Sequence, residues 1–321
     1  MVIKSDVLRL ENSLKKKTKL VAMLAPSFVV DFSYPEVIIM LRKLGFDKIV
    51  EVTYGAKMVN REYHKKLKKS KGLLIATTCP GVAQVVKNKF PKFNKNLALI
   101  DSPMIAMGKI CRKYYPKHKV VFISPCDFKK MEGVKSKNID YVVDFSELKK
   151  MFSDAKVKKP KIRNPEGVTF DKFYNDYTKV YPTAGGLSKT AHLNGILKNK
   201  EIYIAEGVGD LIKFLENPDS RVRFLDATFC VGSCIGGPRV ISKKPIRRKL
   251  RRVRKYLRDS RRQDIPDEKK GLVSRAKGII FRKKVKGLSN SSTLAFKRGP
   301  GLEPGKTSSA GKRSSRCAIR A

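Results

Sequence analysis

Four of the six cysteines in this 321-residue chain lie at the ends of short apolar runs or just beyond one. Cys79 ends the run GLLIATTC, Cys126 ends KVVFISPC and Cys230 ends RVRFLDATFC, with Cys234 one short bend later. Glycine and proline neighbours allow close backbone approach and leave amide groups free to hydrogen-bond anionic sulfur. A cysteine that only packs in a core needs no such surroundings, so the pattern favours metal-binding thiolates.

The apolar runs before these cysteines are predicted to be β-strands, and helical patterns alternate with such strands up to about residue 241. A strand over residues 19–26, for example, precedes a helix over residues 34–46 that has Pro35 in its first turn and Gly45 at its end. This alternation is typical of parallel α/β layers. Ligands of such sheets bind at the carboxyl ends of the strands, so we expect three loops to bring four thiolates together.

Four soft thiolates are typical ligands of zinc or of an iron–sulfur cluster. Structural zinc sites usually combine two compact cysteine pairs. Here a single pair, Cys230 and Cys234, is joined by two cysteines from far upstream. Dispersed ligands favour a 4Fe-4S cube inside a larger fold. A zinc site and a set of unconnected structural cysteines remain the alternatives.

The chain is strongly basic, with 72 Lys and Arg against 28 Asp and Glu and a net charge of +44. The excess is spread over the body and the C-terminal part, and the tail has no aromatic residues interleaved with its charges. We therefore do not expect specific nucleic-acid binding, only nonspecific attraction to polyanions. The N-terminus lacks the apolar core of a secretory signal and no run is long enough to cross a bilayer, which predicts a cytoplasmic protein without membrane contact.

Composition predicts three parts along the chain. Residues 1–242 form the α/β body. Residues 243–287 form a basic helical extension, whose apolar residues from Ile246 to Leu257 have helical spacing. Residues 288–321 are rich in Ser, Gly, Pro and basic residues, which predicts a disordered basic tail.

The segments around the four cysteines resemble the three cysteine motifs found in the C-terminal domain of the large chain of iron-only (FeFe) hydrogenases, in the same order. They are TTCPG (77–81), SPCDFKKME (124–132) and DATFCVGSCIGGP (226–238). The resemblance covers about residues 18–270 and identifies the chain as a divergent member. It implies two intertwined α/β lobes with parallel sheets and a metal site in the cleft between them, where the four cysteines hold a 4Fe-4S cube.

The resemblance also suggests residues around the metal site. Lys129 matches a lysine that hydrogen-bonds a cyanide of the family's two-iron subsite, and Asp226 stands where the family carries Glu, either accepting loop amides or facing water. Thr78 replaces a proton-relay cysteine, and a threonine hydroxyl does not titrate near neutral pH. Ser124 and Thr228 replace methionines that line the two-iron subsite. These departures count against a two-iron subsite and fast hydrogen turnover.

The predicted function is that of a hydrogenase-like iron–sulfur redox protein, either a hydrogen or redox sensor or a low-activity hydrogenase that is an oxidoreductase only with a two-iron subsite. No dense ferredoxin-like cysteine run is present, so an external electron donor or a signalling partner is expected. The alternatives are a non-catalytic cluster carrier or assembly-type protein and a zinc-stabilised interaction protein. Cys111 is expected to be an inert buried thiol, and the scattered histidines His64, His118 and His192 to be surface or structural residues.

Overall fold

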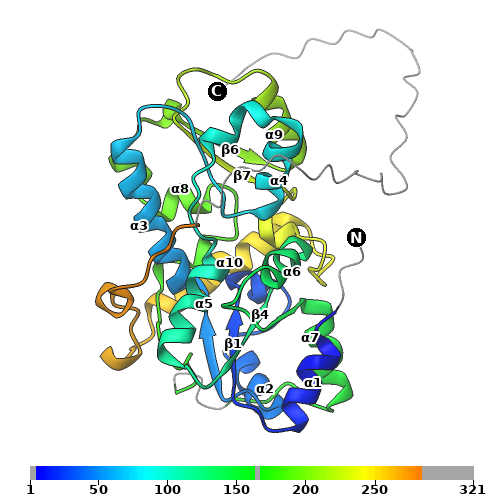
Figure 1. Cartoon of the computed structure of the whole chain (residues 1–321). Coiled ribbons are helices and arrows are strands. Elements are labelled where there is room, and N and C mark those ends of the chain that lie inside the picture. Colours follow the sequence, from blue (N-terminus) through cyan, green and yellow to red (C-terminus); the bar gives the residue numbers. More distant parts are fainter. Residues whose placement is uncertain (1–4, 163–166, 284–321) are drawn as a thin grey trace, which may run out of the picture. The chain divides into compact units, whose positions relative to one another are not determined.

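The computed structural model describes residues 5–162 and 167–283 of the chain (Figure 1). The described residues belong to one compact unit. The tail predicted for residues 288–321 and the last residues of the predicted extension lie outside the described ranges.

Two parallel sheets organise the described residues. One sheet has the strand order β2-β1-β4-β5 and the other the order β3-β7-β6, and every pairing within them is parallel. The strand bounds are β1 Leu20–Leu24, β2 Lys48–Glu51, β3 Leu74–Ile75, β4 Lys119–Ile123, β5 Tyr141–Val143, β6 Ile202–Glu206 and β7 Phe224–Thr228. This confirms the predicted α/β class with parallel sheets.

Helices connect and cover these strands (Figure 1). Their bounds are α1 Val7–Lys15, α2 Glu36–Leu44, α3 Thr53–Lys69, α4 Pro80–Lys89, α5 Pro103–Tyr114, α6 Asp127–Val134, α7 Phe145–Asp154, α8 Gly186–Thr190, α9 Val208–Glu216 and α10 Ile246–Arg261. Three short 3-10 helices all contact α10: η1 Pro26–Val30, η3 Tyr177–Val180 and η6 Ser233–Gly236. None of the helices described is long and apolar enough to span a membrane.

The local sequence predicts the extent of helix α2 well but overestimates that of α8. α2 begins directly after Pro35 and is followed by Gly45, which adopts φ +107°, so the predicted helix is present but starts and ends two residues inside the predicted range. The glycine turn and helix predicted around residue 186 give only the five-residue α8. The chain leaves this helix because His192 adopts the left-handed region with φ +51°, which a continuous helix cannot contain.

The side chains of β1 alternate between two apolar clusters, one on each face of its sheet. Val21 and Met23 pack in the cluster that contains Tyr63 of α3 and Met107 of α5. The intervening residues pack in the cluster formed with α2, α7 and α10. All five β1 residues are buried, as expected for a parallel strand covered on both faces.

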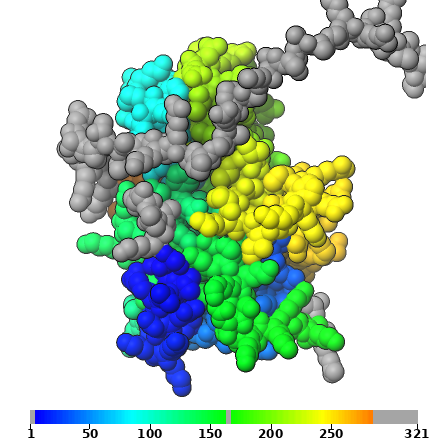
Figure 2. Space-filling view, turned by 90° about the vertical axis from the view of Figure 1, so that its right-hand side faces the viewer, coloured from blue at the N-terminus to red at the C-terminus, as the bar shows by residue number. Residues whose placement is uncertain are grey.

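α10 packs against η1, η3 and η6. Val253 and Tyr256 are 0% and 4% exposed, whereas Ile246 is 37% exposed. Tyr256, rather than the neighbouring Leu257 of the predicted apolar stripe, therefore lies in the core. Basic side chains cover the opposite side of the helix, and Figure 2 shows this segment, in yellow, on the molecular surface.

Candidate metal centre

Each cysteine motif follows the carboxyl end of a strand, as predicted. Cys79 follows β3 and stands at the N-cap position of α4, and Cys126 follows β4 at the N-cap position of α6. Cys230 follows β7, and Cys234 lies within η6. Strands β3 and β7 are neighbours in one sheet and β4 belongs to the other, so both sheets contribute cysteines. The positive ends of α4 and α6 favour anionic groups beside Cys79 and Cys126.

Two cavities border the cysteines. Cys79, Cys126 and Cys234 line a cavity of about 110 Å³, together with Thr78 and Lys129. Asp226 lines the same cavity. Cys126 and Cys230 line a second, wider cavity of about 530 Å³. The cysteines of all three motifs thus lie around two cavities that share Cys126.

The thiols influence one another's ionisation. Burial raises the pKa of Cys126 to about 12 and that of Cys230 to about 11, and the nearby thiol of Cys79 adds to both effects. Burial raises the pKa of Cys234 as well, and the other three thiols contribute to that shift. Among the described residues, no three Cys, His, Asp or Glu side chains are placed to hold a single metal ion.

The side chain of Cys234 has an exposed surface, yet burial by surrounding protein is the main cause of its raised pKa. The exposed surface of Cys234 faces the smaller cavity, and protein surrounds the rest of the side chain. The backbone just after Cys234 is closely packed. A Cβ on Gly236 would lie 2.0 Å from the carbonyl oxygen of Val231, and one on Gly237 would lie 2.7 Å from that of Pro125. Only glycine permits the end of η6 to pack so closely on Val231, and the residue after η6 to pack so closely on the Cys126 loop.

Lys129 connects the first two motifs. Its ammonium group donates to the carbonyl oxygen of Thr78 at 3.1 Å and to Glu132 at 2.6 Å. Glu132 also accepts a hydrogen bond from the hydroxyl of Ser102 at 2.9 Å. Lys129 therefore lines the cavity beside the cysteines, and hydrogen bonds to Thr78 and Glu132 fix its ammonium group there.

Asp226 is buried and its carboxylate accepts hydrogen bonds from the backbone and the hydroxyl of Ser188, at 2.9 and 2.7 Å. Burial raises the pKa of Asp226, and the two hydrogen bonds from Ser188 only partly oppose this shift. Asp226 is therefore buried and does not face water, and the amide that its carboxylate binds belongs to helix α8 rather than to a loop. This hydrogen bond joins β7 to α8.

The comparisons with known proteins agree with the motifs. Residues 18–238 match the family model described as "Iron only hydrogenase large subunit, C-terminal domain". The chain belongs to this family. Iron hydrogenase 1 from Clostridium pasteurianum is 26% identical in an alignment over 300 residues, and the match covers 73% of this chain and 52% of the relative. The chain thus spans about half the length of this curated hydrogenase.

Solved FeFe-hydrogenase structures share the fold. HydA(deltaEFG), a structure concerned with stepwise H-cluster assembly, has a TM-score of 0.58 at 14% identity over 85% of this chain and 91% of that chain. A variant of HydA1 from Chlamydomonas reinhardtii has a TM-score of 0.59 at 15% identity over 84% and 90% of the two chains. The predicted fold of the iron-only hydrogenase family is therefore confirmed.

The positions that depart from the hydrogenase pattern line the smaller cavity. Thr78, Ser124 and Thr228 all border it. The hydroxyl of Thr228 lies 3.2 Å from that of Ser233, whereas the buried Ser124 hydroxyl has no hydrogen-bond partner in the described part of the chain. These substitutions place hydroxyl groups in a cavity that is otherwise largely apolar.

Two further residues, Ser27 and Tyr181, line the smaller cavity although neither was predicted to belong to the site. They lie in the short segments LAPSF and YPTAGG, where nothing in the sequence marks one residue above its neighbours as a site residue. The Ser27 hydroxyl is buried and lacks a hydrogen-bond partner within residues 5–162 and 167–283. The cavity wall therefore contains polar groups, from Ser27 and Ser124, that are free to contact a bound group.

Proposed function

We propose that the protein is a hydrogenase-like iron–sulfur redox protein of the cytoplasm that binds one 4Fe-4S cluster through Cys79, Cys126, Cys230 and Cys234. The observation that carries this proposal is the convergence of three strand-end loops on two adjoining cavities that share Cys126. Four thiols form a donor set suited to such a cluster, and the family relationship supports an iron–sulfur cofactor.

The surrounding residues suit an anionic cluster. The N-termini of α4 and α6 carry partial positive charge beside Cys79 and Cys126. The ammonium group of Lys129, which also pairs with Glu132, adds a cation to the wall of the same cavity. The glycines of the third motif allow its backbone to approach the neighbouring loops closely. When bound, the cluster would supply one-electron transfer.

We infer a sensor or a low-activity hydrogenase because the chain lacks a proton-relay thiol at residue 78. Thr78 lines the cavity, but its hydroxyl cannot exchange a proton near neutral pH as a thiol can. The nearby Tyr181 phenol cannot replace it, since burial raises its pKa further above the ordinary value of a tyrosine. Infrared bands of iron-bound CO and cyanide in anaerobically matured protein would demonstrate a two-iron subsite, and their absence would favour the sensor or the cluster carrier.

The electron donor or signalling partner is proposed to be a separate acidic protein. Val231, next to Cys230, is 76% exposed and marks the point where the wider cavity reaches the surface. α10 packs against η6 and presents exposed arginines such as Arg251 and Arg254. Opposite charge would bring an acidic partner to this side of the molecule. Stopped-flow reduction by an acidic ferredoxin should slow as the salt concentration rises.

Metal analysis after anaerobic purification tests the main proposal. We expect about four iron and four sulfide ions per chain and visible absorption that bleaches with dithionite. Cys230→Ser should lose most of the iron, whereas Cys111→Ala should retain it because Cys111 is fully buried in the core, as predicted, and lines neither cavity. A colourless protein, or zinc in place of iron, would refute the proposal and favour the zinc-stabilised alternative.

A further inference from the structure

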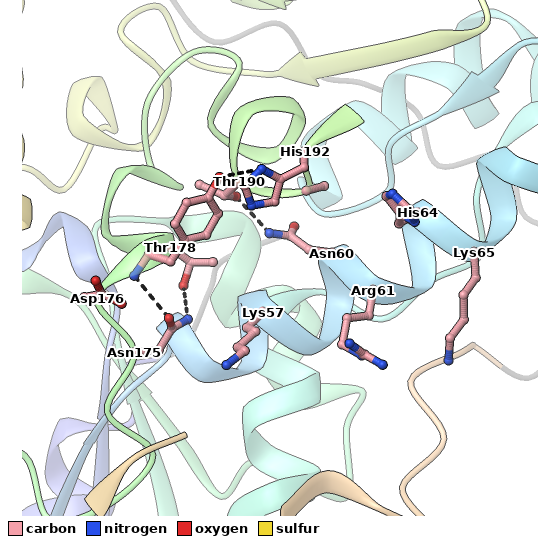
Figure 3. Close-up of a pocket in the computed structure, with 12 residues that line it drawn as sticks. Lys57, Asn60, Arg61, His64, Lys65, Asn175, Asp176, Thr178, Thr190 and His192 are labelled. Carbon is pink, nitrogen blue, oxygen red and sulfur yellow. Dashed lines mark hydrogen bonds between the residues drawn. The ribbon is translucent and has the colours of Figure 1, made fainter. Parts of the chain in front are cut away.

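A separate groove of about 520 Å³ runs across α3 (Figure 3). It shares no lining residue with either cysteine cavity. One side is formed by α3, and the other by residues 175–178 and 190–192. Its volume falls within the range of pockets that bind small molecules.

Three cations of α3 share this groove. Lys57, Arg61 and Lys65 follow one another at four-residue spacing, and Figure 3 shows them extending from one edge of the helix. Like charges at this spacing repel each other and destabilise a helix. Lys57 donates to the carbonyl oxygen of Gly271 at 3.0 Å, and Lys65 pairs with Glu62 at 3.1 Å. Arg61 is exposed and has neither an ion pair nor a side-chain hydrogen bond to any described residue.

Negative charge inside the groove does not balance these cations. Asp176 is the one carboxylate among the described lining residues, and it lies 3.7 Å from Arg261 of α10. The net charge of the lining is therefore positive even with both histidines neutral. The three cations extend over about 12 Å of helix, so an extended anion would contact more of them than a single phosphate would.

The opposite wall is held in place by hydrogen bonds. Asn60 donates to the hydroxyl of Thr190 at 2.8 Å, which joins α3 to α8. The hydroxyl of Thr178 donates to the carbonyl oxygen of Thr53 at 2.6 Å and fixes η3 against the start of α3. The groove therefore keeps its form without a ligand, which lowers the entropic cost of binding one.

An aromatic pair completes this wall. The rings of Tyr177 and His192 stack with centroids 4.6 Å apart and an interplanar angle of 12°. The Tyr177 hydroxyl lies 3.1 Å from Nδ1 of His192. His192 is exposed, so its ring offers a flat, accessible surface on which a planar heterocycle can stack.

We propose that this groove binds a nucleoside polyphosphate, with the phosphates on Lys57, Arg61 and Lys65 and the base on the Tyr177–His192 pair. A nucleotide joins a multivalent anion to a planar base, which are the two features that the groove accommodates. This proposal involves none of the cysteines and is independent of the proposed iron–sulfur function.

Isothermal titration calorimetry of the full chain with ATP, inorganic pyrophosphate and adenosine at about 0.15 M salt tests the proposal. We expect saturable binding of one ATP per chain, with weaker binding of pyrophosphate and of adenosine. Arg61→Gln and Lys57→Gln should each weaken ATP binding about tenfold, because each removes a charge-assisted contact. Lys43→Gln, which removes an exposed charge of α2, should leave it unchanged.

His192→Ala tests the base contact. It should weaken ATP binding several-fold and leave pyrophosphate binding unchanged, since pyrophosphate has no ring to stack. Cys230→Ser should bind ATP normally, so that failure of the cluster proposal is distinguishable from failure of this one. Circular dichroism of each variant checks that the fold is retained.

Three outcomes would overturn the proposal. Unsaturable ATP binding, or equal weakening by Lys43→Gln and Arg61→Gln, would show general attraction to a basic chain. Equal affinities for pyrophosphate and ATP, with no effect of His192→Ala, would indicate a site for inorganic phosphates. A single-stranded RNA that displaces ATP and binds more tightly would indicate a nucleic-acid surface.

Discussion

The ammonium group of Lys129 donates a hydrogen bond to the carbonyl oxygen of Thr78, and so links the second cysteine motif to the first across the sheets that carry them. The same group pairs with Glu132 at 2.6 Å, and both side chains are 13% exposed. Lys129 therefore has a structural role at the site as well as a charge that suits an anionic cluster.

Replacing Lys129 by leucine should lower the free energy of unfolding by about 2 kcal/mol, because it leaves the largely buried Glu132 without its closest cation. Urea denaturation measures the change. Adding Glu132→Leu should recover part of the loss, since the second change removes the unpaired carboxylate. Lys89→Leu, at an exposed position at the end of α4, serves as the control. Equal effects of Lys89→Leu and Lys129→Leu would show that the ion pair contributes no stability.

Gly236→Ala should disrupt the third cysteine motif. The new Cβ would lie 2.0 Å from the carbonyl oxygen of Val231, so the backbone around Cys234 must shift. We expect a loss of more than about 2 kcal/mol in unfolding free energy and a reduced iron content. Gly209→Ala in α9 is the matched control, because nothing lies within 4 Å of its Cβ position. A Gly236→Ala protein that retains full iron and stability would contradict the assigned role of this turn.

Lys179→Met should be among the most destabilising single substitutions. Lys179 is 0% exposed and forms an ion pair with Glu51, while Tyr256 donates to the same carboxylate at 2.8 Å. Removing the cation leaves Glu51 buried and unpaired, which costs about 3–5 kcal/mol. Thermal and urea unfolding measure the loss. Lys200→Met, at an exposed position, should change stability by no more than about 0.5 kcal/mol.

Asp144 should make stability depend on pH in the acid range. Burial alone would raise its pKa, but hydrogen bonds from Lys130, Ser146 and the Glu147 amide outweigh burial and lower the pKa below its usual value. A lowered folded-state pKa contributes stability that is fully present above the unfolded value of about 3.9 and is lost as the pH falls through the folded value.

Asp144→Asn should therefore cost about 2 kcal/mol at pH 7, because it keeps an N-cap acceptor for α7 but replaces the carboxylate that pairs with the buried Lys130 by a neutral amide. The difference from the unsubstituted protein should shrink below about pH 4. Asp154→Asn, at the exposed end of the same helix, is the control and should have little effect at either pH. A difference that stayed constant from pH 7 to pH 3 would exclude the ionic contribution.

The elements that carry the site were predictable because their signals are local. Pro35 and Gly45 delimit α2, and β-branched runs mark the strands that precede each cysteine motif. The division into two sheets was implied by the family resemblance and not by these runs, since a run gives no information on which strand it pairs with. The N-terminal helix α1 was not predicted at all.

Long-range contacts account for what the sequence did not reveal. Lys179 looks like one more surface charge in a basic chain, yet its partners Glu51 and Tyr256 lie 128 and 77 residues away. The groove on α3 likewise needs residues 175–178 and 190–192, whose approach no local pattern indicates. His64 and His192 were predicted to be surface or structural residues, and only the structure shows that they line a common groove. The binding of a metal by the four cysteines remains a prediction.

The contacts of Tyr256 limit where a shortened expression fragment can end. The family match ends at residue 238, but the ring of Tyr256 packs against Phe28 at 5.4 Å and Tyr34 at 5.0 Å between centroids. An expression fragment trimmed to the homologous segment would leave these two aromatic rings facing water and Glu51 short of a donor. The end of the family match and the physical boundary of the folding unit therefore do not coincide in this hydrogenase relative.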